Sequence, residues 1–389
     1  MTGVRGGGLD AEVGVIGVGT IGSLLSWQLA RRGVRALGFE RHAPGHDNGA
    51  VGGETRLFRL AYAEGAQYAG LLRQALAHWR ELEAESGAAL LVQCGGLAIG
   101  DPRRDYIGGL LASSRTSGVP VEVLDSDAAR ERYPQHLLRD GEVAVLDRQA
   151  GFLRCEPAVI AAAAAAERTG ATVHRHTEID RVTEHDDHVE IRAGEVTWRV
   201  RDAVVCAGSW TARLLPAHWR EHLQARRVPL SWFAARRPEE FTPDRFPIFI
   251  RRTGALELYG APTVDGVSVK VAGAVRSSPV EDPDDVVRRH DRAEIAAMSS
   301  AVREVLPGLH PHPVRTDAYT DLYSSDGAPL VGRTAAGGRL LVASGFSGRG
   351  FKYAPALASV VADALVGGTE VPLDFMAPGR LVSLGNHRA

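Results

Sequence analysis

Apolar and polar positions near the start of the chain follow a strand, helix, strand pattern. The run Glu12–Gly17 is almost continuously apolar, which is typical of a short buried strand. A glycine turn follows, and apolar residues then recur at helical spacing over Ile21–Arg32, with Gly33 where the helix would end. Val34–Glu40 has the composition of a second strand. Three such elements within about 30 residues have the order and length of a βαβ unit.

Loops, helices and strands alternate over the rest of the chain. We expect a loop over Arg41–Glu54, helices over Tyr68–Ser86 and Pro157–Gly170, short strands over Thr172–Val200, a buried strand over Asp202–Cys206, a strand pair of Leu256–Tyr259 with Val267–Ala272, and a strand over Arg339–Ser344. After the last strand come a glycine turn and a helix that runs through Val366. The pattern predicts an α/β protein (α+β overall), with a Rossmann-like domain and a second domain built on a large mixed or antiparallel sheet.

Dinucleotide-binding elements at both ends of the chain indicate a domain assembled from separate segments. We predict that residues 11–85, 150–215 and 325–380 form the dinucleotide-binding domain, and that residues 86–149 and 216–324 form a substrate domain inserted into it. Residues 1–10 lack the apolar stretch of a signal peptide, so we expect a disordered leader.

Composition narrows the class of protein. The chain has 389 residues and a formal net charge of −2, so it has no excess of positive charge that would attract nucleic acid. No apolar run reaches the roughly 18–20 residues that span a bilayer. The three cysteines are far apart, in no disulfide or metal-ligand spacing. We therefore expect a cytoplasmic protein that binds a small molecule as a monomer or weak homodimer, without nucleic-acid or membrane partners.

The turn after the first strand, Gly17–Gly22, reads GVGTIG and matches G-x-G-x-x-G. Gly17 would make the tight turn, Gly19 would let backbone approach a pyrophosphate, and Gly22 would let the helix pack on the strand. Glu40 follows Gly22 by 18 positions, where a carboxylate accepts hydrogen bonds from ribose hydroxyls. A glycine turn without ligand is the alternative. The residues expected to hold an adenine dinucleotide here are Gly17, Gly19, Thr20, Ile21, Gly22, Glu40 and Arg41.

A second glycine-rich turn, Gly345–Gly350, reads GFSGRG and again lies between a strand and a helix. Such a turn offers convergent backbone N–H groups, which suit a ring that is negatively charged when reduced. A plain strand-to-helix turn is the alternative. Two such turns favour FAD over NAD, since a long cofactor with a tricyclic ring must be held at both ends. The expected cofactor-binding residues here are Gly345, Phe346, Gly348, Arg349, Gly350 and Lys352.

Lysine is rare in this chain: Lys270 and Lys352 are the only two among 45 lysine and arginine residues. A general preference for arginine codons explains most of the imbalance, but a lysine that persists under it is a candidate for a role that arginine cannot fill. Strand alternation over Val267–Ala272 puts Lys270 on the face opposite the valines. A lysine that faces inward is costly unless paired or functional, and an exposed lysine on an edge strand is the alternative.

Arg56, Arg59 and Tyr62 recur at i, i+3 and i+6, so on a helix or tight turn they would share one face. Arginines beside a cofactor loop can hold a carboxylate in a bidentate manner, and a solvated basic face is the alternative. The fourteen histidines show no metal-ligand spacing, and His310 and His312 flank prolines as loop residues do. We therefore predict no metal site.

Taken together, these motifs resemble those of the monomeric sarcosine oxidase and N-methyltryptophan oxidase family of FAD-dependent amine oxidases, within the D-amino-acid-oxidase-like superfamily. The resemblance extends from about Val13 to about Asp374. It is carried by VIGVGTIGS, GETRLFRLAYAEG, LYGAP, the strand with Lys270, and GFSGRGFKY.

The resemblance implies a role for each matching residue. Arg59 and Lys352 would clamp the substrate carboxylate. Arg56 would lie beside the flavin ring, and Lys270 would stand against the flavin and activate oxygen, which makes these two the expected catalytic residues. The remaining substrate-binding residues would be Tyr62, Tyr259 and Tyr323, the last of them close to the flavin.

Three positions depart from the family pattern. The cysteine that carries a covalent flavin in the family aligns with Asp321, so a thioether at that position is impossible and FAD should be bound noncovalently. Two flavin-proximal histidines align with Gly52 and Ala274. Both changes remove bulk and polarity, so we expect a larger or differently shaped amine substituent to fit.

The sequence thus predicts an FAD-dependent oxidase of a secondary-amine amino acid, an N-substituted glycine. Its imine product would hydrolyse, and O2 would be reduced to H2O2. One alternative is a flavin-dependent dehydrogenase that uses a different electron acceptor. A flavin-binding protein without turnover is the alternative of another class, and a nicotinamide dehydrogenase is disfavoured by the second glycine turn.

Overall fold

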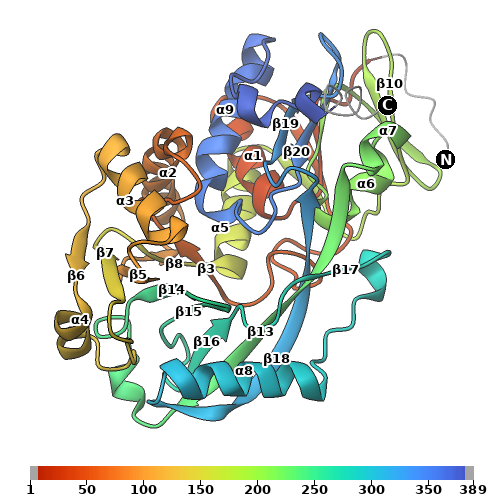
Figure 1. Cartoon of the computed structure of the whole chain (residues 1–389). Helices are drawn as coiled ribbons and strands as arrows, with labels where there is room; N and C mark the ends of the chain where they lie inside the picture. Colours follow the sequence, from red (N-terminus) through yellow and green to blue (C-terminus); the bar gives the residue numbers. More distant parts are fainter. Residues whose placement is uncertain (1–7, 382–389) are drawn as a thin grey trace, which may run out of the picture.

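The computed structural model describes residues 8–381 and has a mixed α/β fold built on two large sheets (Figure 1). The first sheet has a parallel core in the order β9-β2-β1-β12-β20, extended by antiparallel strands. Its strands are β1 (Ala11–Ile16), β2 (Ala36–Phe39), β9 (Thr172–His174), β10 (Arg181–Glu184), β11 (Val189–Ala193), β12 (Val196–Val205), β19 (Leu330–Arg333) and β20 (Leu340–Ser344). The predicted Rossmann-like fold class is confirmed.

Three helices, α1 (Thr20–Arg31), α5 (Cys155–Arg168) and α9 (Ala354–Gly367), pack together and share a hydrophobic cluster with β1 and β20 (Figure 1). The alanine-rich helix α5 lies against α1. Ala162 and Ala165 are fully buried there, because a methyl side chain lets two helix axes approach closely. This packing fixes the amino-terminal end of α1 above the carboxyl end of β1, where the glycine turn lies.

The second sheet is mostly antiparallel and has the order β17-β13-β16-β15-β14-β5-β7-β6, with β18 paired along β13. Helix α8 (Arg292–Val305) covers one of its faces (Figure 1), where Met298 and Val302 join the core of this sheet. Its strands are β5 (Gly96–Gly100), β6 (Glu122–Leu124), β7 (Val143–Asp147), β13 (Leu223–Ala235), β14 (Ile248–Thr253), β15 (Leu256–Ala261), β16 (Ser268–Ala272), β17 (Ser278–Pro279) and β18 (Leu309–Ser324).

A small third sheet has the strand order β3-β8-β4, and its strand β3 contributes side chains to the site. Its strands are β3 (Thr55–Phe58), β4 (Leu91–Val92) and β8 (Gly151–Arg154). The remaining helices are α2 (Ala69–Ser86), α3 (Asp105–Ser117), α4 (Ser126–Arg132), α6 (Thr211–Leu214) and α7 (Ala217–Arg220). Short 3₁₀ turns occupy Ala66–Tyr68, Gly208–Trp210, Pro238–Glu240, Pro283–Asp285, Phe351–Tyr353 and Asp374–Met376. Within residues 8–381, no helix combines the length and apolar character needed to cross a bilayer.

Most predicted elements are present with ends shifted by one to three residues, but the loop position predicted for two histidines is wrong. His310 and His312 belong to strand β18, where Phe233 of β13 pairs with Pro313 across an irregular register that accommodates the prolines. The expected leader of residues 1–10 falls mostly on residues 1–7, outside the described residues. Asp10 exchanges hydrogen bonds with Arg199, so it is anchored to β12.

The strands of each large sheet fall within the segments predicted for each domain. All strands of the first sheet lie in residues 11–85, 150–215 and 325–380, and all strands of the second lie in residues 86–149 and 216–324. The domain boundaries themselves stay a prediction.

Candidate functional site

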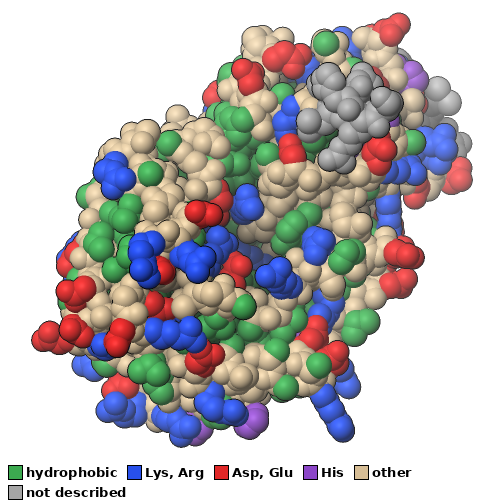
Figure 2. Space-filling model, viewed as in Figure 1, with side chains coloured by type: hydrophobic (Ala, Val, Ile, Leu, Met, Phe, Trp, Pro, Cys, Tyr) green, Lys and Arg blue, Asp and Glu red, His purple; other side chains and the backbone are tan. Residues whose placement is uncertain are grey.

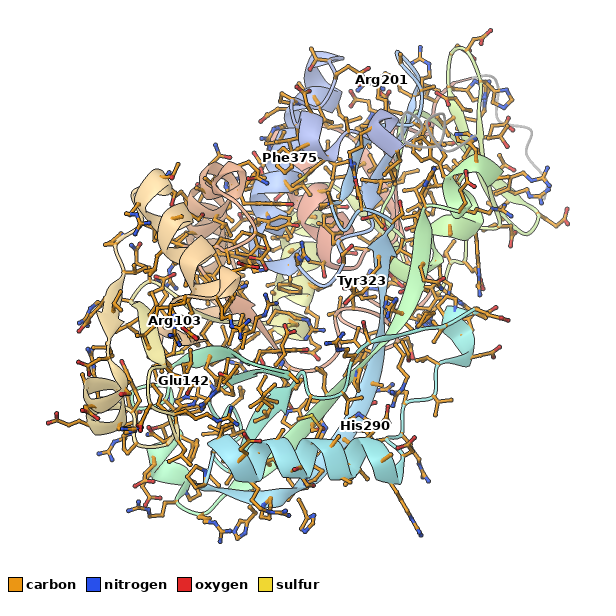
Figure 3. All side chains as sticks on the ribbon, in the orientation of Figure 1. Arg103, Glu142, Arg201, His290, Tyr323 and Phe375 are labelled. Atoms are coloured by element: carbon orange, nitrogen blue, oxygen red, sulfur yellow. The ribbon has the colours of Figure 1, made fainter. Side chains whose placement is uncertain are left out.

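A cavity of about 500 Å³ is lined by residues of both large sheets and of both glycine-rich turns. Figure 2 shows a hollow near the middle of the face in view, with basic side chains gathered around it. Tyr323, one of the lining residues, is labelled near the centre of the same view in Figure 3. The cavity therefore joins the two turns that sequence analysis assigned to opposite ends of one cofactor.

The first glycine turn forms one end of the cavity through Gly17, Gly19, Thr20 and Ile21. A Cβ on Gly19 would meet only Val51, at 3.9 Å, so the backbone there borders open space. Gly22, in contrast, does not line the cavity. A Cβ at this position would lie 1.8 Å from the carbonyl oxygen of Gly17, so Gly22 serves the packing of α1 on the turn and is not a ligand contact.

Glu40 lies at the end of β2 and borders the same end of the cavity. Its carboxylate accepts hydrogen bonds from the N–H groups of Val18 (3.0 Å) and His42 (2.9 Å). Burial raises the pKa of Glu40, but the hydrogen bonds from His46, His42 and Val18 outweigh it and hold the pKa below its usual value. An ionised carboxylate is thus held in place beside the glycine turn, where it would accept ribose hydroxyls and repel a 2′-phosphate.

Arg41 also lines the cavity, and its guanidinium pairs with Glu178 and Asp284, at 3.2 and 2.7 Å. Sequence analysis missed the other walls of this end because they come from distant loops. They include Ala50, Val51, Thr177, Glu178, Cys206, Ala207, Gly208, Ser209, Trp210 and Arg213.

The second glycine turn, Gly345–Gly350, borders the middle of the cavity with all of its residues. Gly345, Ser347 and Gly348 have φ of 70°, 52° and 79°, the left-handed conformation that turns successive N–H groups to one side. The turn is tied to the end of β18, because Ser347 donates its N–H to the Leu322 carbonyl, at 3.0 Å.

Asp321 makes the second tie between β18 and this turn. Its carboxylate accepts the N–H of Gly348 and the N–H of Leu322, both at 2.8 Å. Burial raises the pKa of Asp321 to about 6, although these hydrogen bonds oppose the shift. Of the three cysteines, all of them within residues 8–381, only Cys206 lines the cavity, and its sulfur lies 3.3 Å from the Gly17 carbonyl at the opposite end.

Lys270 projects from β16 into the middle of the cavity and is 4% exposed. Its ammonium donates hydrogen bonds to the carbonyl groups of Gly53 (3.0 Å) and Thr55. Burial, reinforced by the neighbouring Arg56, lowers the pKa of Lys270 to about 7. The inward orientation predicted from strand alternation is what the structure shows, and the ammonium is fixed with one proton left for a ligand.

Arg56 lies in strand β3, paired with Leu153 of β8, so the i, i+3, i+6 spacing of Arg56, Arg59 and Tyr62 does not reflect a helix. Sheet pairing with a distant strand overrides the local i, i+3 pattern. Arg56 nevertheless lines the cavity, and its guanidinium donates to the carbonyls of Ala50 and Gly52, both at 2.7 Å. These bonds brace the loop that carries the Lys270 acceptor Gly53.

Arg59 and Lys352 meet at the end of the cavity away from the first glycine turn. Lys352 is 6% exposed, donates to the Arg349 carbonyl at 3.0 Å, and has a pKa lowered to about 7 by burial and by Arg59. Glu64, which sequence analysis missed, lies 3.9 Å from the Arg59 guanidinium. Burial raises the pKa of Glu64, but Arg59 and Lys352 outweigh it and keep the carboxyl ionised.

The three tyrosines expected at the substrate end do not all reach it. Tyr259 and Tyr323 line the cavity. Tyr62 does not: it is 2% exposed and lies behind the wall, with its ring 5.4 Å from the Arg59 guanidinium carbon and 4.9 Å from the Lys352 ammonium. The predicted role of Tyr62 as a lining residue is therefore wrong, and its ring instead makes cation–π contacts with Arg59 and Lys352.

The expected extra room at Gly52 and Ala274 is not present. A Cβ on Gly52 would lie 2.3 Å from the ring of Tyr319, so that ring fills the space beside the glycine. Tyr319 itself lines the cavity and donates its hydroxyl to Asp317, at 3.1 Å. Ala274 packs against the apolar cluster of the second sheet and does not line the cavity.

A group that sequence spacing did not reveal lies outside this cavity, where the β10–β11 hairpin brings one ligand atom each of His185, His188 and Glu190 within 4.8 Å of one another. The two imidazole rings stack with centroids 4.5 Å apart and planes 11° apart. The absence of a metal site stays a prediction.

The lining residues fit an adenine dinucleotide that ends in a redox ring. One end offers a glycine turn with open space beside Gly19 and an ionised acceptor in Glu40. The middle offers a second set of N–H groups and the fixed ammonium of Lys270, and the far end offers Arg59 and Lys352. Fold and site together define a dinucleotide-dependent oxidoreductase.

Comparison with known proteins identifies the family. The family model for FAD dependent oxidoreductases matches residues 12–364. Monomeric sarcosine oxidase from Streptomyces avermitilis is 32% identical over 380 residues, which cover 96% of this chain and 98% of that protein. N-methyl-L-tryptophan oxidase from Yersinia pestis is 29% identical over 361 residues, which cover 91% of this chain and 94% of that protein.

A solved structure shares the fold. NikD, an unusual amino acid oxidase essential for nikkomycin biosynthesis, superposes with a TM-score of 0.83 at 22% sequence identity, covering 95% of this chain and 98% of that one. The chain belongs to the FAD-dependent oxidoreductase family, and the resemblance noted in its sequence is confirmed.

Proposed function

We propose that this enzyme is an oxidase of a secondary-amine amino acid, an N-substituted glycine, that binds FAD noncovalently and reduces O2 to H2O2. The observation that carries the proposal is the meeting of Arg59 and Lys352 at one end of a cavity whose middle holds Lys270. The similarity to a sarcosine oxidase and an N-methyl-L-tryptophan oxidase supports the same class of substrate.

Arg59 and Lys352 would bind the substrate carboxylate. Arg59 presents a planar fork and Lys352 a compact point charge, so the two fix both the position and the plane of a carboxylate. The ring of Tyr62 supports both cations, and Glu64 keeps one negative charge beside them. A carboxylate held there fixes the reacting C–H bond, which is where positioning contributes to the rate.

The same cations favour the reactive form of the amine. Oxidation next to nitrogen needs a free lone pair, and nearby positive charge lowers the pKa of a substrate ammonium. Arg59, Lys352 and, nearer the middle, Lys270 all lie along the cavity wall. They would promote loss of the ammonium proton in the bound substrate.

The chemistry that bound FAD would supply is the uptake of two electrons from the substrate and their transfer to O2. The residues expected to hold it are those of the two glycine turns together with Glu40 and Arg56. Lys270 would stabilise the negative charge that develops on oxygen, since its ammonium is fixed in advance by the Gly53 and Thr55 carbonyls. Noncovalent attachment is supported by Asp321 at the middle of the cavity, since Cys206 lies at the end formed by the first glycine turn.

Three measurements test the proposal. Purified holoenzyme should form H2O2 under air with N-alkyl glycines such as sarcosine, and the same amines should bleach the flavin spectrum without air. Bleaching without peroxide would indicate a dehydrogenase, and no bleaching by any amino acid would reject the proposal. Acid precipitation should release all of the flavin; yellow precipitate would reject noncovalent binding.

A further inference from the structure

Four basic side chains border the substrate end of the cavity: Arg59, Arg252, Arg349 and Lys352. Three of them have a hydrogen-bond or ion-pair partner. The Arg59 guanidinium lies 3.9 Å from Glu64, the Lys352 ammonium donates to the Arg349 carbonyl at 3.0 Å, and Arg252 directs two N–H groups to one oxygen of Glu257, at 2.9 and 2.7 Å. Among the described residues, the Arg349 guanidinium has neither a hydrogen bond nor an ion pair. The charge of Arg349 is therefore available to a ligand.

The backbone of Arg349 is held firmly although its side chain is exposed. Its N–H donates to Phe346, and its carbonyl accepts the Lys352 ammonium, both at 3.0 Å. A Cβ on Gly350 would lie 2.5 Å from the Phe346 ring, so the turn is packed tightly on both sides of Arg349. A tightly packed turn thus presents an exposed, unpaired guanidinium at the mouth of the cavity.

Arg349 lines the cavity three positions before Lys352, and its own carbonyl accepts the Lys352 ammonium. Its positive charge acts to lower the pKa of Tyr62 and Glu64, which lie beside the carboxylate-binding pair, and that of Tyr323. Basic side chains surround the hollow in Figure 2, which matches a mouth that attracts anions.

We propose that Arg349 binds a second carboxylate of the substrate, so that the enzyme prefers a dicarboxylic secondary amine. Arg59 and Lys352 would take the carboxylate next to the reacting carbon, and Arg349 would take one carried by the nitrogen substituent or by the side chain. A guanidinium is suited to this because it grips a carboxylate with two parallel hydrogen bonds. The inference rests on the proposed function and refines its substrate class.

Matched substrate pairs test the preference in the holoenzyme. Iminodiacetate should be oxidised with at least a tenfold higher kcat/KM than sarcosine, and N-methyl-L-glutamate should exceed N-methyl-L-leucine similarly, with the difference mainly in KM. Arg349→Gln should reduce each ratio about tenfold, the size expected for a charge-assisted hydrogen bond. Arg252→Gln is the matched control, since Glu257 already pairs with it, and should alter each ratio by less than about threefold. Arg349→Lys keeps the charge without the fork and should fall between them.

A binding measurement separates this inference from the proposed reaction. Thiodiacetate and (methylthio)acetate carry sulfur in place of the amine, and their binding can be followed by the change in flavin absorbance. Thiodiacetate should bind at least tenfold more tightly, and Arg349→Gln should remove that advantage. Equal binding of the two would overturn the inference even if amines are oxidised. Loss of FAD from Arg349→Gln with unchanged ratios would assign Arg349 to the cofactor and overturn it too. If thiodiacetate is preferred but no amine is oxidised, the inferred anion site stands and the proposed reaction fails.

Discussion

Lys270 and Lys352 are the same residue type in the same kind of place, yet their surroundings differ. Both are nearly buried, at 4% and 6% exposure, and burial lowers the pKa of each to about 7. The Lys270 ammonium is held between the Gly53 and Thr55 carbonyls. The Lys352 ammonium has one carbonyl acceptor, Arg349, and faces aromatic rings.

The difference separates a fixed charge from an adaptable one. The carbonyls of Gly53 and Thr55 leave the Lys270 ammonium little freedom to move. A donor that is oriented in advance is suited to stabilise negative charge that develops only briefly during the reaction. Lys352 lies over the Tyr62 ring, 4.9 Å away, so it can shift toward an arriving carboxylate without breaking a second hydrogen bond. Replacement of one lysine should therefore slow a different step of the reaction from replacement of the other.

Replacement of Lys270 gives the largest expected effect. In Lys270→Met, reduction of the flavin by substrate should be nearly normal, whereas reoxidation by O2 should slow about 30- to 1000-fold. This corresponds to the roughly 2–4 kcal/mol of a preorganised donor. Stopped-flow absorbance resolves the two half-reactions. Lys352→Met is the control, because it should leave the reoxidation rate within about threefold, and an unchanged rate in Lys270→Met would remove the assigned role.

Replacement of Lys352 should act on binding. In Lys352→Met, KM for a carboxylate substrate should rise about 10- to 100-fold, as expected when one charge-assisted hydrogen bond is lost and Arg59 acts alone. Steady-state kinetics with the corresponding substrate amide provide the check, since the amide should lose far less. An equal loss for acid and amide would mean that Lys352 positions the turn and not the carboxylate.

Local pattern was sufficient to predict the parts of the site that depend on neighbours in sequence. The strand, turn and helix around Gly17–Gly22 and the inward face of Lys270 follow from periodicity, and the structure has both. The charged pair of Glu64 with Arg59 was missed because a single acidic residue in a loop carries no pattern. Arg349 was assigned to the cofactor from its motif, and the absence of a partner for its guanidinium within residues 8–381 was visible only in space.

Contacts between distant segments account for the wrong predictions. The spacing of Arg56, Arg59 and Tyr62 does not mark a helix, because Arg56 lies in β3, which pairs with β8 from about a hundred residues away. The room expected at Gly52 is filled by Tyr319 from β18, which no local pattern around Gly52 encodes. A glycine at this position therefore does not by itself open the cavity.

The pH dependence of anion binding should also tell the lysines apart. With a pKa near 7, Lys352 is charged below that pH and neutral above it. Affinity for (methylthio)acetate should therefore fall as pH rises through about 7, by at most tenfold per unit, toward a limit set by Arg59. Flavin absorbance titrations from pH 6 to 9 measure it. Lys270→Met should retain this slope and Lys352→Met should lose it, and a slope shared by both variants would contradict the assignment.

Replacement of Tyr62, whose ring lies beside the Lys352 ammonium, should have the smallest effect on the kinetics. Tyr62→Leu removes the ring that lies 4.9 Å from the Lys352 ammonium and 5.4 Å from the Arg59 guanidinium carbon. A cation–π contact contributes about 0.5–2 kcal/mol, so KM should rise about twofold to 30-fold with little change in reoxidation by O2. Tyr62→Phe keeps the ring and loses only a hydroxyl that has no hydrogen-bond partner among the described residues, so it should resemble the unmodified enzyme. Equal KM values for the leucine and phenylalanine variants would show that Lys352 does not depend on the ring, and the contrast between a fixed and an adaptable lysine would then rest on the hydrogen bonds alone.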